Sequence, residues 1–435
     1  MPRALAMIGV VLAFVLASGA GQAEEPDPSH GPWLTGNWGG LRSRLFEQGL
    51  DFQFVFTSEI AYNPAGGLRP GIAYAGQGTF GLTFDLQRLI GLQDARFQLT
   101  YTSRTGQDLV ANAGLGTLQL VQEVYGRGQT VRLTQFWFQQ KYLNGLLDWK
   151  VGRTSMGEDF AAFSCDFQNL TFCGSNPGNI VGGYVYNWPI SQWGTRLKVA
   201  LDGFGYFQAG VYDQNEQYLG YADKLLPVFY PRSTGVLVPA EVAWLPKFGE
   251  NNLAGSYKLG GWYSNTMAND VLVDINGNAI SISGLPAAQR RGRYGAYLNF
   301  EQQLTKTATE NPKGGLKMFL NAVQADTETS VLDRQIAVGM VYTGPFKSRP
   351  NDSVAFAVGT THVNHRVAQG QALLNSVGLG PVPVQNSEYV FELYYTVVPV
   401  SGVYLRPNIQ YVHSPGASTQ HPDILILGLK SQIFF

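Results

Sequence analysis

Apolar and polar residues alternate along one short segment of this chain after another. From position 50 to 56 the even positions carry Leu or Phe, and the odd positions up to 59 include Asp51, Gln53 and Glu59. A period of two gives a β-strand one apolar and one polar face. Strands with one face for lipid and one for water close into a transmembrane barrel, so we predict an all-β, antiparallel β-barrel of about 16 strands.

Sixteen segments carry this strand signal, although 72–88 and 131–142 alternate poorly. The predicted strands are 50–61, 72–88, 94–103, 131–142, 146–153, 195–201, 204–212, 235–245, 253–263, 291–304, 315–326, 335–343, 353–361, 388–397, 403–413 and 424–434.

The connections between these segments alternate in length. Those after odd-numbered strands run 10, 27, 41, 22, 27, 8, 26 and 10 residues, and those after even-numbered strands run 5, 3, 2, 7, 10, 9 and 5. Long loops at one end and short turns at the other are typical of outer-membrane barrels, and an even strand number places both termini on the periplasmic side.

The first residues predict export. Arg3 precedes the uncharged apolar run 4–17, and small residues at Gly21 and Ala23 offer a cleavage site before Glu24. We therefore interpret 1–23 as a signal peptide. A membrane anchor is the alternative, but the run is shorter than the ~20 residues that a spanning helix needs.

The mature chain then divides into two parts. Residues 24–49 form an N-terminal periplasmic segment, in which Leu41, Leu45 and Phe46 predict a short helix, and 50–435 form the barrel. The formal net charge of −1 argues against nucleic acid as a partner. The expected surroundings are the outer membrane of a Gram-negative bacterium, with its lipids and lipopolysaccharide.

The last strand has an outward face that ends on an aromatic residue. Five residues share this face, namely Leu425, Leu427, Leu429, Ile433 and Phe435. We expect the barrel assembly machinery to recognise this strand. A homotrimer is possible, and no sequence feature decides between it and a monomer.

A long loop, 154–194, follows a strand in which Leu147, Trp149 and Val151 share one face. We expect this loop to fold inward and narrow the pore. It contains both cysteines, Cys165 and Cys173, which in an oxidising compartment predict a disulfide. A metal pair or a reactive thiol is the alternative, but no His lies nearby in the sequence.

Three stretches resemble the carbohydrate-selective porins of the OprB family. Residues 37–42, NWGGLR, resemble the family's G-D-W-G-G-x-R motif, with Asn37 in place of Asp. Residues 165–174, CDFQNLTFCG, resemble its C-x-F-Q-N-L-x-F-C-G loop, and 388–395 with 405–411 resemble its closing strands. The resemblance implies a sixteen-stranded outer-membrane barrel that admits monosaccharides such as glucose.

A sugar channel needs charged and amide groups for hydroxyls and aromatic rings for pyranose faces. Candidate substrate-binding residues on the loop are Arg153, Glu158, Asp159, Phe160, Phe163, Gln168 and Asn169. Candidates on or near the strands are Glu59, Arg96, Arg104, Arg196, Glu392 and Arg406. Each polar residue is alternatively a solvated or salt-bridged lumen residue, and both Phe rings are alternatively loop packing.

Other functions have weaker support. A general or ion-selective diffusion porin is the first alternative, and a barrel enzyme, for which only His413 beside Ser414 stands at a convincing strand end, is the second. A larger maltooligosaccharide channel requires two more strands than we count.

Two motifs do not indicate a site. The glycines at 76–81 fit a nucleotide-binding pattern but continue as strand rather than opening a helix, and the spacing of His362 and His365 lacks a third ligand for a metal. We expect no catalytic residues, no cofactor and no metal.

Overall fold

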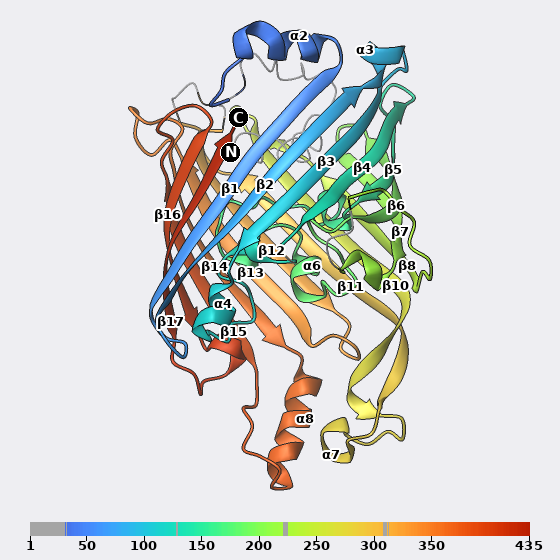
Figure 1. Cartoon of the computed structure of the whole chain (residues 1–435), viewed down its shortest axis with the longest axis vertical. Coiled ribbons are helices and arrows are strands. Elements are labelled where there is room, and N and C mark those ends of the chain that lie inside the picture. The colour runs from blue at the N-terminus through green and yellow to red at the C-terminus, as the bar shows by residue number, and fades with distance from the viewer. Residues whose placement is uncertain (1–30, 32, 128, 221–224, 308–310, 312) are drawn as a thin grey trace.

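The chain forms a closed antiparallel β-barrel (Figure 1). A computed structural model describes it except for residues 1–30, 32, 128, 221–224, 308–310 and 312, so the predicted signal peptide at 1–23 lies outside the described residues. Each strand pairs with its neighbours in sequence, and the first strand closes the sheet by pairing with the last. No helix of the described part of the chain is long and apolar enough to span a membrane.

The wall has sixteen strands, which confirms the prediction. They are β1 (Leu50–Ala65), β2 (Gly71–Asp85), β3 (Ala95–Gly106), β4 (Val131–Tyr142), β5 (Leu147–Thr154), β6 (Gln192–Leu201), β7 (Gly205–Gln214), β8 (Gly235–Trp244), β10 (Leu253–Asp274), β11 (Ala287–Gln303), β12 (Gly315–Ala325), β13 (Leu332–Thr343), β14 (Ser353–Val363), β15 (Ser387–Thr396), β16 (Val403–His413) and β17 (Ile424–Phe434). A two-residue strand, β9 (Lys247–Phe248), pairs only with the start of β10.

The alternation in the sequence becomes an outer apolar face and an inner polar face. On β1, Phe54 and Ile60 are 41% and 40% exposed, whereas Glu59 and Asn63 between and beyond them are fully buried. Burial of carboxylates and amides inside the barrel shows that the lumen is filled by protein at this level rather than by water alone. Aromatic side chains also pack there, among them Phe163, Phe167, Phe172, Phe319 and Tyr394.

The N-terminal segment packs against the barrel where β1 pairs with β17. It forms η2 (Trp38–Gly40) and the short helix α2 (Leu41–Glu47), which confirms the predicted helix. Arg42 Nη2 donates to the main-chain oxygen of Phe435 at 2.7 Å, and its guanidinium lies 4.0 Å from the ring centroid of Trp33 and 4.2 Å from that of Trp38. These contacts connect the described part of the N-terminal segment to Phe435, which directly follows β17.

The connections at the α2 end of the barrel are short, and among their described residues only 86–94 contains a helix, α3 (Leu86–Ile90). The opposite end carries the longer loops. These hold α4 (Leu109–Ala113), η3 (Glu123–Tyr125), α5 (Met156–Asp159), η4 (Leu170–Phe172), α6 (Asn176–Ile180), η5 (Glu216–Tyr218), α7 (Ile280–Ser283), α8 (His365–Ser376) and η6 (Pro415–Ala417).

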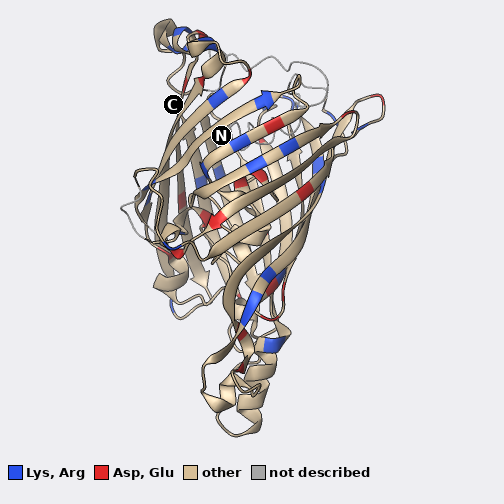
Figure 2. Ribbon diagram, turned by 90° about the vertical axis from the view of Figure 1, so that its right-hand side faces the viewer, with Lys and Arg blue, Asp and Glu red and all other residues tan. Residues whose placement is uncertain are grey.

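One predicted loop is instead mostly strand. We expected a 27-residue connection between strands ending at 263 and starting at 291, but β10 has 22 residues and β11 has 17. Beyond Ser264, β10 no longer pairs with β8 and continues only as a hairpin with β11, with α7 at its tip and α8 beside it. This projection, the outer hairpin, is visible at the lower end of Figures 1 and 2. Outside the membrane a strand pair needs no apolar face, so the period-two signal that marks the wall is lost. The first predicted loop is shortened in the same way, because β1 runs to Ala65.

Candidate functional site in the barrel lumen

The loop 155–191 lies inside the barrel, as predicted, and wall residues hold it along its whole path. It begins against β4, β5 and β6, where Lys150 Nζ lies 2.5 Å from Asp159 Oδ2. Arg196 Nη2 lies 3.6 Å from Asp159 Oδ1, and Gln135 Nε2 donates to Glu158 Oε2 at 2.7 Å. Glu158 also completes a capping box with Ser155 at the start of α5. The two acidic residues therefore fix the first turn of the loop.

The middle of the loop is held through its backbone. Glu241 on β8 accepts the N–H of Ala161 at 2.9 Å, and the hydroxyls of Tyr206 and Tyr297 each donate to the same carboxylate at 2.7 Å. Lys258 Nζ on β10 donates to the carbonyl of Ala162 at 2.7 Å. The wall thus supplies an acceptor and a donor for two consecutive loop residues.

The disulfide segment, residues 165–173, lies against β15 and β16 on the far side of the lumen. The backbone N–H groups of Gln168 and Asn169 each donate to one oxygen of Glu392 at 2.8 Å. Their side chains bond to the wall as well: Asn408 Nδ2 donates to Gln168 Oε1 at 2.8 Å, and Asn169 Nδ2 donates to Gln410 Oε1 at 2.9 Å. Both predicted site residues therefore anchor the loop.

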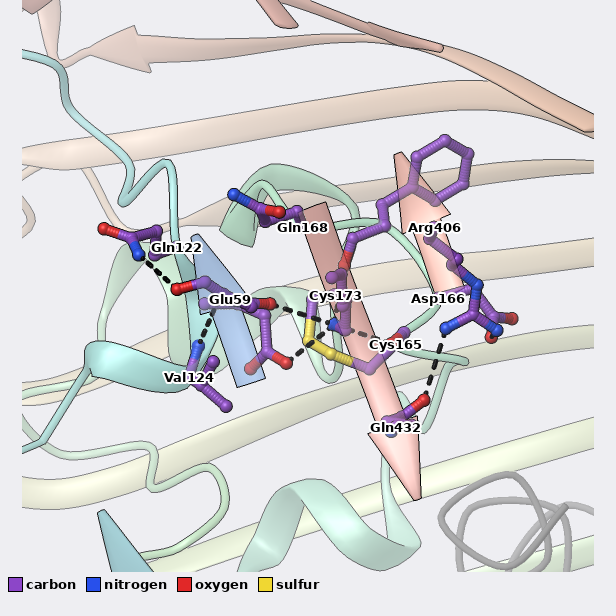
Figure 3. A network of polar contacts seen from close by, with 12 residues as sticks. Glu59, Gln122, Val124, Cys165, Asp166, Gln168, Cys173, Arg406 and Gln432 are labelled. Atoms are coloured by element: carbon purple, nitrogen blue, oxygen red, sulfur yellow. Dashed lines mark hydrogen bonds and ion pairs between the residues drawn. A yellow bond between two sulfur atoms is a disulfide. The ribbon is translucent and has the colours of Figure 1, made fainter. Parts of the chain in front are cut away.

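Two cations complete this anchorage (Figure 3). Arg406 on β16 lies 2.9 Å from Asp166 and also donates to Gln432 on β17 at 3.2 Å. Lys430 on β17 lies 3.2 Å from Glu59, and its Nζ donates to the carbonyls of Cys165 at 3.1 Å and Phe167 at 2.9 Å.

Cys165 and Cys173 form a disulfide, with their Cα atoms 4.2 Å apart. The bond confirms the predicted pair and engages both sulfurs, so neither is a thiol here. The disulfide closes the segment that Glu392 and Lys430 bind. Within this segment, the ring centroids of Phe167 and Phe172 lie 5.1 Å apart. This segment is therefore compact and is hydrogen-bonded to the barrel wall.

A second loop, described at 107–127 and 129–130, also folds into the lumen, whereas the sequence predicts this only for the loop 154–194. Glu123 N donates to Gln168 O at 3.0 Å, and Leu170 N donates to Leu120 O at 2.9 Å, so the two loops pair through their backbones. Glu59 accepts the N–H of Val124 at 3.2 Å, and Glu123 lies 2.8 Å from Lys430. The missed signal was a 27-residue connection that contains the buried apolar residues Leu109, Leu115 and Val121.

The predicted site residues thus fall into separate groups. Glu59, Gln168, Asn169, Glu392 and Arg406 meet at the disulfide segment, whereas Glu158, Asp159 and Arg196 meet at α5. Arg104 on β3 donates from Nε to Gln77 at 2.8 Å and from Nη1 to the carbonyl of Gly126. Arg96 lies beside Gln139 in the β3–β4 register.

Phe160, Phe163 and Arg153 are also packed. Phe160 is fully buried with its ring centroid 6.2 Å from that of Tyr212, and Phe163 lies 4.8 Å from Phe319. Arg153 donates to the carbonyl of Ser191 at 3.0 Å and lies 5.1 Å from the ring of Tyr218. Eleven of the thirteen candidate residues are buried, and Arg96 and Asp159 are intermediate, although the side chain of Asp159 is only 7% exposed.

Two histidines lie outside the lumen network. His362 Nδ1 is 2.6 Å from Asp333, and His413 Nδ1 is 3.0 Å from Asp423, to which Ser414 contributes its backbone N–H. Hydrogen bonds from Tyr411 and His413 lower the pKa of Asp423 to about 2 and outweigh the opposite effect of burial. The contact of Ser414 with Asp423 is thus a main-chain one.

Four wall glutamates share one role. Glu59, Glu241, Glu388 and Glu392 each accept at least one backbone N–H from an inward loop; for Glu388 the donors are Leu118 and Gly416, both at 2.8 Å. Carboxylates that accept backbone N–H groups make strong, charge-assisted bonds. The arrangement fixes the path of both loops inside the barrel.

Comparison with known proteins gives one consistent group. The family model of the carbohydrate-selective porin, OprB family, matches residues 69–435. The chain is 38% identical to Porin B of Pseudomonas aeruginosa, covering 97% of this chain and 95% of that protein, and 33% identical to the putative porin QuiX of Acinetobacter baylyi, covering 98% and 99%. The high-pH structure of Pseudomonas putida OprB superposes with a TM-score of 0.89 at 39% identity, covering 94% of this chain and 100% of that one.

Proposed function

The chain belongs to the carbohydrate-selective porin, OprB family, and from this premise we propose how it admits sugars. It is an outer-membrane porin of a Gram-negative bacterium, a channel rather than an enzyme. Sugars of monosaccharide size diffuse passively through the opening that the loops 107–130 and 155–191 leave in the barrel. The observation that carries this function is the family match over residues 69–435, which includes both loops and every wall strand that anchors them except β1.

The walls of the opening set what passes. Bidentate guanidinium groups, carboxylates and amides can replace water around sugar hydroxyls, and binding must stay weak enough for the solute to leave. We assign sugar contact to the charged groups that keep some exposure, namely Asp166 in the loop 155–191 and Arg96 on β3. Asp159, whose carboxylate pairs with Lys150 and Arg196, holds the loop instead. The buried members of the candidate set, such as Glu59 and Glu392, then act by holding the loops in place.

The partners follow from the compartment. We propose that 1–23 is removed on export and that the assembly machinery binds β17, whose end carries Phe434 and Phe435. Lipids and lipopolysaccharide would surround the outward apolar face, where Phe54 and Phe80 lie opposite each other on β1 and β2. Whether three copies associate is a separate question, answered by the mass of the detergent-solubilised protein.

Single-channel recording in a planar bilayer tests the function. D-glucose should block the ion current in a saturable way, and sorbitol, a polyol of similar size, should block it less. Stable conductance that ignores both solutes would instead support a general diffusion porin. Absence of any channel from correctly folded protein would refute the porin function itself.

A further inference from the structure

A groove lies between the N-terminal segment and the barrel wall at the α2 end. Its volume is about 400 Å³, which is within the range of pockets that hold small ligands. Within the described residues it is lined by Thr35, Trp38, Arg42, Phe52, Gln53, Phe54, Phe80 and Phe435. Five of these eight side chains are aromatic and only Arg42 is charged, so the groove fits an apolar ligand.

The wall side of this groove belongs to the outer face of the barrel. Phe54 and Phe80 lie directly opposite each other on β1 and β2 and are 41% and 45% exposed. Their neighbours in the two strands, Val55 and Thr79, are buried on the opposite face. The ring of Phe435 stacks on that of Phe54, with the centroids 4.9 Å apart. These three rings therefore face lipid rather than the lumen.

The groove lies at the depth where acyl chains begin. Outward aromatic rings contact one another at the α2 end of several strands, in the pairs Phe84–Phe97, Phe138–Trp149 and Trp244–Tyr257. Such a row marks the membrane–water boundary of a barrel. On β2, Phe80 lies farther from the α2 end than Phe84, so the groove reaches to the membrane side of this row. The short turns place this end on the periplasmic side.

The N-terminal segment forms the other side of the groove (Figure 1). Trp38 is 40% exposed, and its indole N–H donates to Thr35 Oγ1 at 3.0 Å, so its apolar ring remains for a ligand. Arg42 is 3% exposed and lies between the rings of Trp33 and Trp38. Its Nε and Nη1 are buried, and its Nη2 donates to Phe435. Arg42 is therefore part of the frame of the groove and is not placed to bind a lipid headgroup.

We propose that this groove binds an acyl chain of a phospholipid from the periplasmic leaflet of the outer membrane. The bound chain contacts Trp38 of the N-terminal segment, Phe54 and Phe80 of the first two strands and Phe435 after the last strand. It thereby holds the segment against the barrel where β1 pairs with β17. Residues 24–30, EEPDPSH, fit the groove poorly, because they carry three carboxylates and no large apolar side chain.

Native mass spectrometry of the detergent-solubilised protein tests this site with dioleoyl phosphatidylethanolamine as the probe. The variant is Phe80→Gln, and the control is Phe204→Gln, because Phe204 is 44% exposed at the same end of the barrel and does not line the groove. The wild-type protein should retain the lipid. Phe80→Gln should weaken its binding about tenfold through the lost apolar contact, and Phe204→Gln should leave it unchanged. Dihexanoyl phosphatidylethanolamine, with the same headgroup and short chains, should not be retained.

A second variant keeps the test valid if Phe80→Gln does not fold. Thr35→Trp fills the groove from the N-terminal segment and leaves the wall intact, so it should also lose the lipid. In the wild-type protein the lipid should slow hydrogen exchange of 41–47, and in Thr35→Trp it should not. Exchange that is the same with and without retained lipid would contradict the holding of the segment.

Three results would overturn the proposal. Equal retention by Phe80→Gln, Thr35→Trp and Phe204→Gln would show that the lipid covers the barrel without a specific site. Retention that follows the headgroup, with phosphatidylglycerol and phosphatidylethanolamine differing while chain length has no effect, would indicate a headgroup site instead. Dimers of the chain that carry no lipid and that dissociate in Thr35→Trp would make the groove a contact between copies. None of these results bears on sugar passage, which the bilayer recordings measure separately.

Discussion

Glu59 and Lys430 lie directly opposite each other on the two strands that close the barrel, with Lys430 Nζ 3.2 Å from Glu59 Oε1. The same ammonium contacts Glu123 of one inward loop and carbonyl oxygens of the other. One wall lysine therefore joins barrel closure to the positions of both loops.

Lys430→Met should destabilise the folded barrel by about 3–5 kcal/mol, because it leaves buried carboxylates without their cation. The free energy of unfolding from urea titration in lipid vesicles measures this. Lys347→Met, at an exposed position, is the control. Equal stability of the two variants would show that Lys430 does not hold the seam.

Glu392→Gln should loosen the disulfide segment while the barrel stays folded. A glutamine has one acceptor oxygen for the two N–H groups of Gln168 and Asn169, and an unmet buried donor costs about 1–3 kcal/mol. We expect larger fluctuations of single-channel current and weaker block by glucose. Glu301→Gln is the control, because Glu301 pairs with Lys317 at 3.0 Å and receives no loop N–H in the described structure. Identical traces for the two variants would argue against loop anchoring by Glu392.

Cys165→Ser should also act locally. In the chain-entropy model, closing this short loop stabilises it by about 2–3 kcal/mol. Current noise should rise and glucose block should weaken, with heat-modifiable migration on gels unchanged. Dithiothreitol should produce the same change in the wild-type protein and none in the variant. Unaltered currents after verified reduction would remove the disulfide from the selectivity mechanism.

The outer hairpin should detach from α8 in strong acid. Burial raises the pKa of Asp270, but backbone N–H groups of Val273 and Leu272, with Arg290 and Arg366, outweigh it and lower this pKa to about 2. Arg366 Nη2 on α8 lies 2.6 Å from Asp270 Oδ1. A depressed folded-state pKa gives stability that is full above the unfolded value of 3.8 and is lost as the pH falls through about 2.

Hydrogen exchange of 365–376 measures this docking. Protection should be constant from pH 7 to about pH 4 and should fall below that value. Asp270→Asn should lower it at every pH, whereas Glu328→Gln, at an exposed carboxylate, should not. Loss of protection near neutral pH in the wild-type protein would contradict the role of Asp270.

The wall could be predicted from the sequence because the membrane imposes a strict rule on it. A strand between lipid and lumen must alternate apolar and polar residues, so segments such as 403–413 can be recognised as strands from the sequence. The rule ends where the membrane ends, and for that reason the sequence predicts a loop over the strand residues 264–274. The short N-terminal helix and the disulfide were also predicted, from local patterns that need no knowledge of distant contacts.

The candidate site was predicted only in part. Charged residues at lumen positions were recognised, but the sequence does not tell which of them meet. Glu392 and Gln168 are 224 residues apart, and their bond depends on how the loop crosses the lumen. Lys430 is not among the predicted site residues, because the sequence around a lysine in a closing strand does not indicate its four partners. The inward course of 107–130 was missed because its acceptors lie on β1 and in the other loop.

The wall glutamates hold the inward loops by main-chain N–H groups, and every residue except proline offers that group. Loop side chains that face the opening can therefore be exchanged during evolution while the loop keeps its course. At Leu118, Val124, Ala161, Gln168 and Asn169 the wall excludes one residue type, proline, and leaves the main-chain bond open to the other nineteen. A barrel of this kind can change which solutes it admits while its strands and the anchors of its loops stay the same.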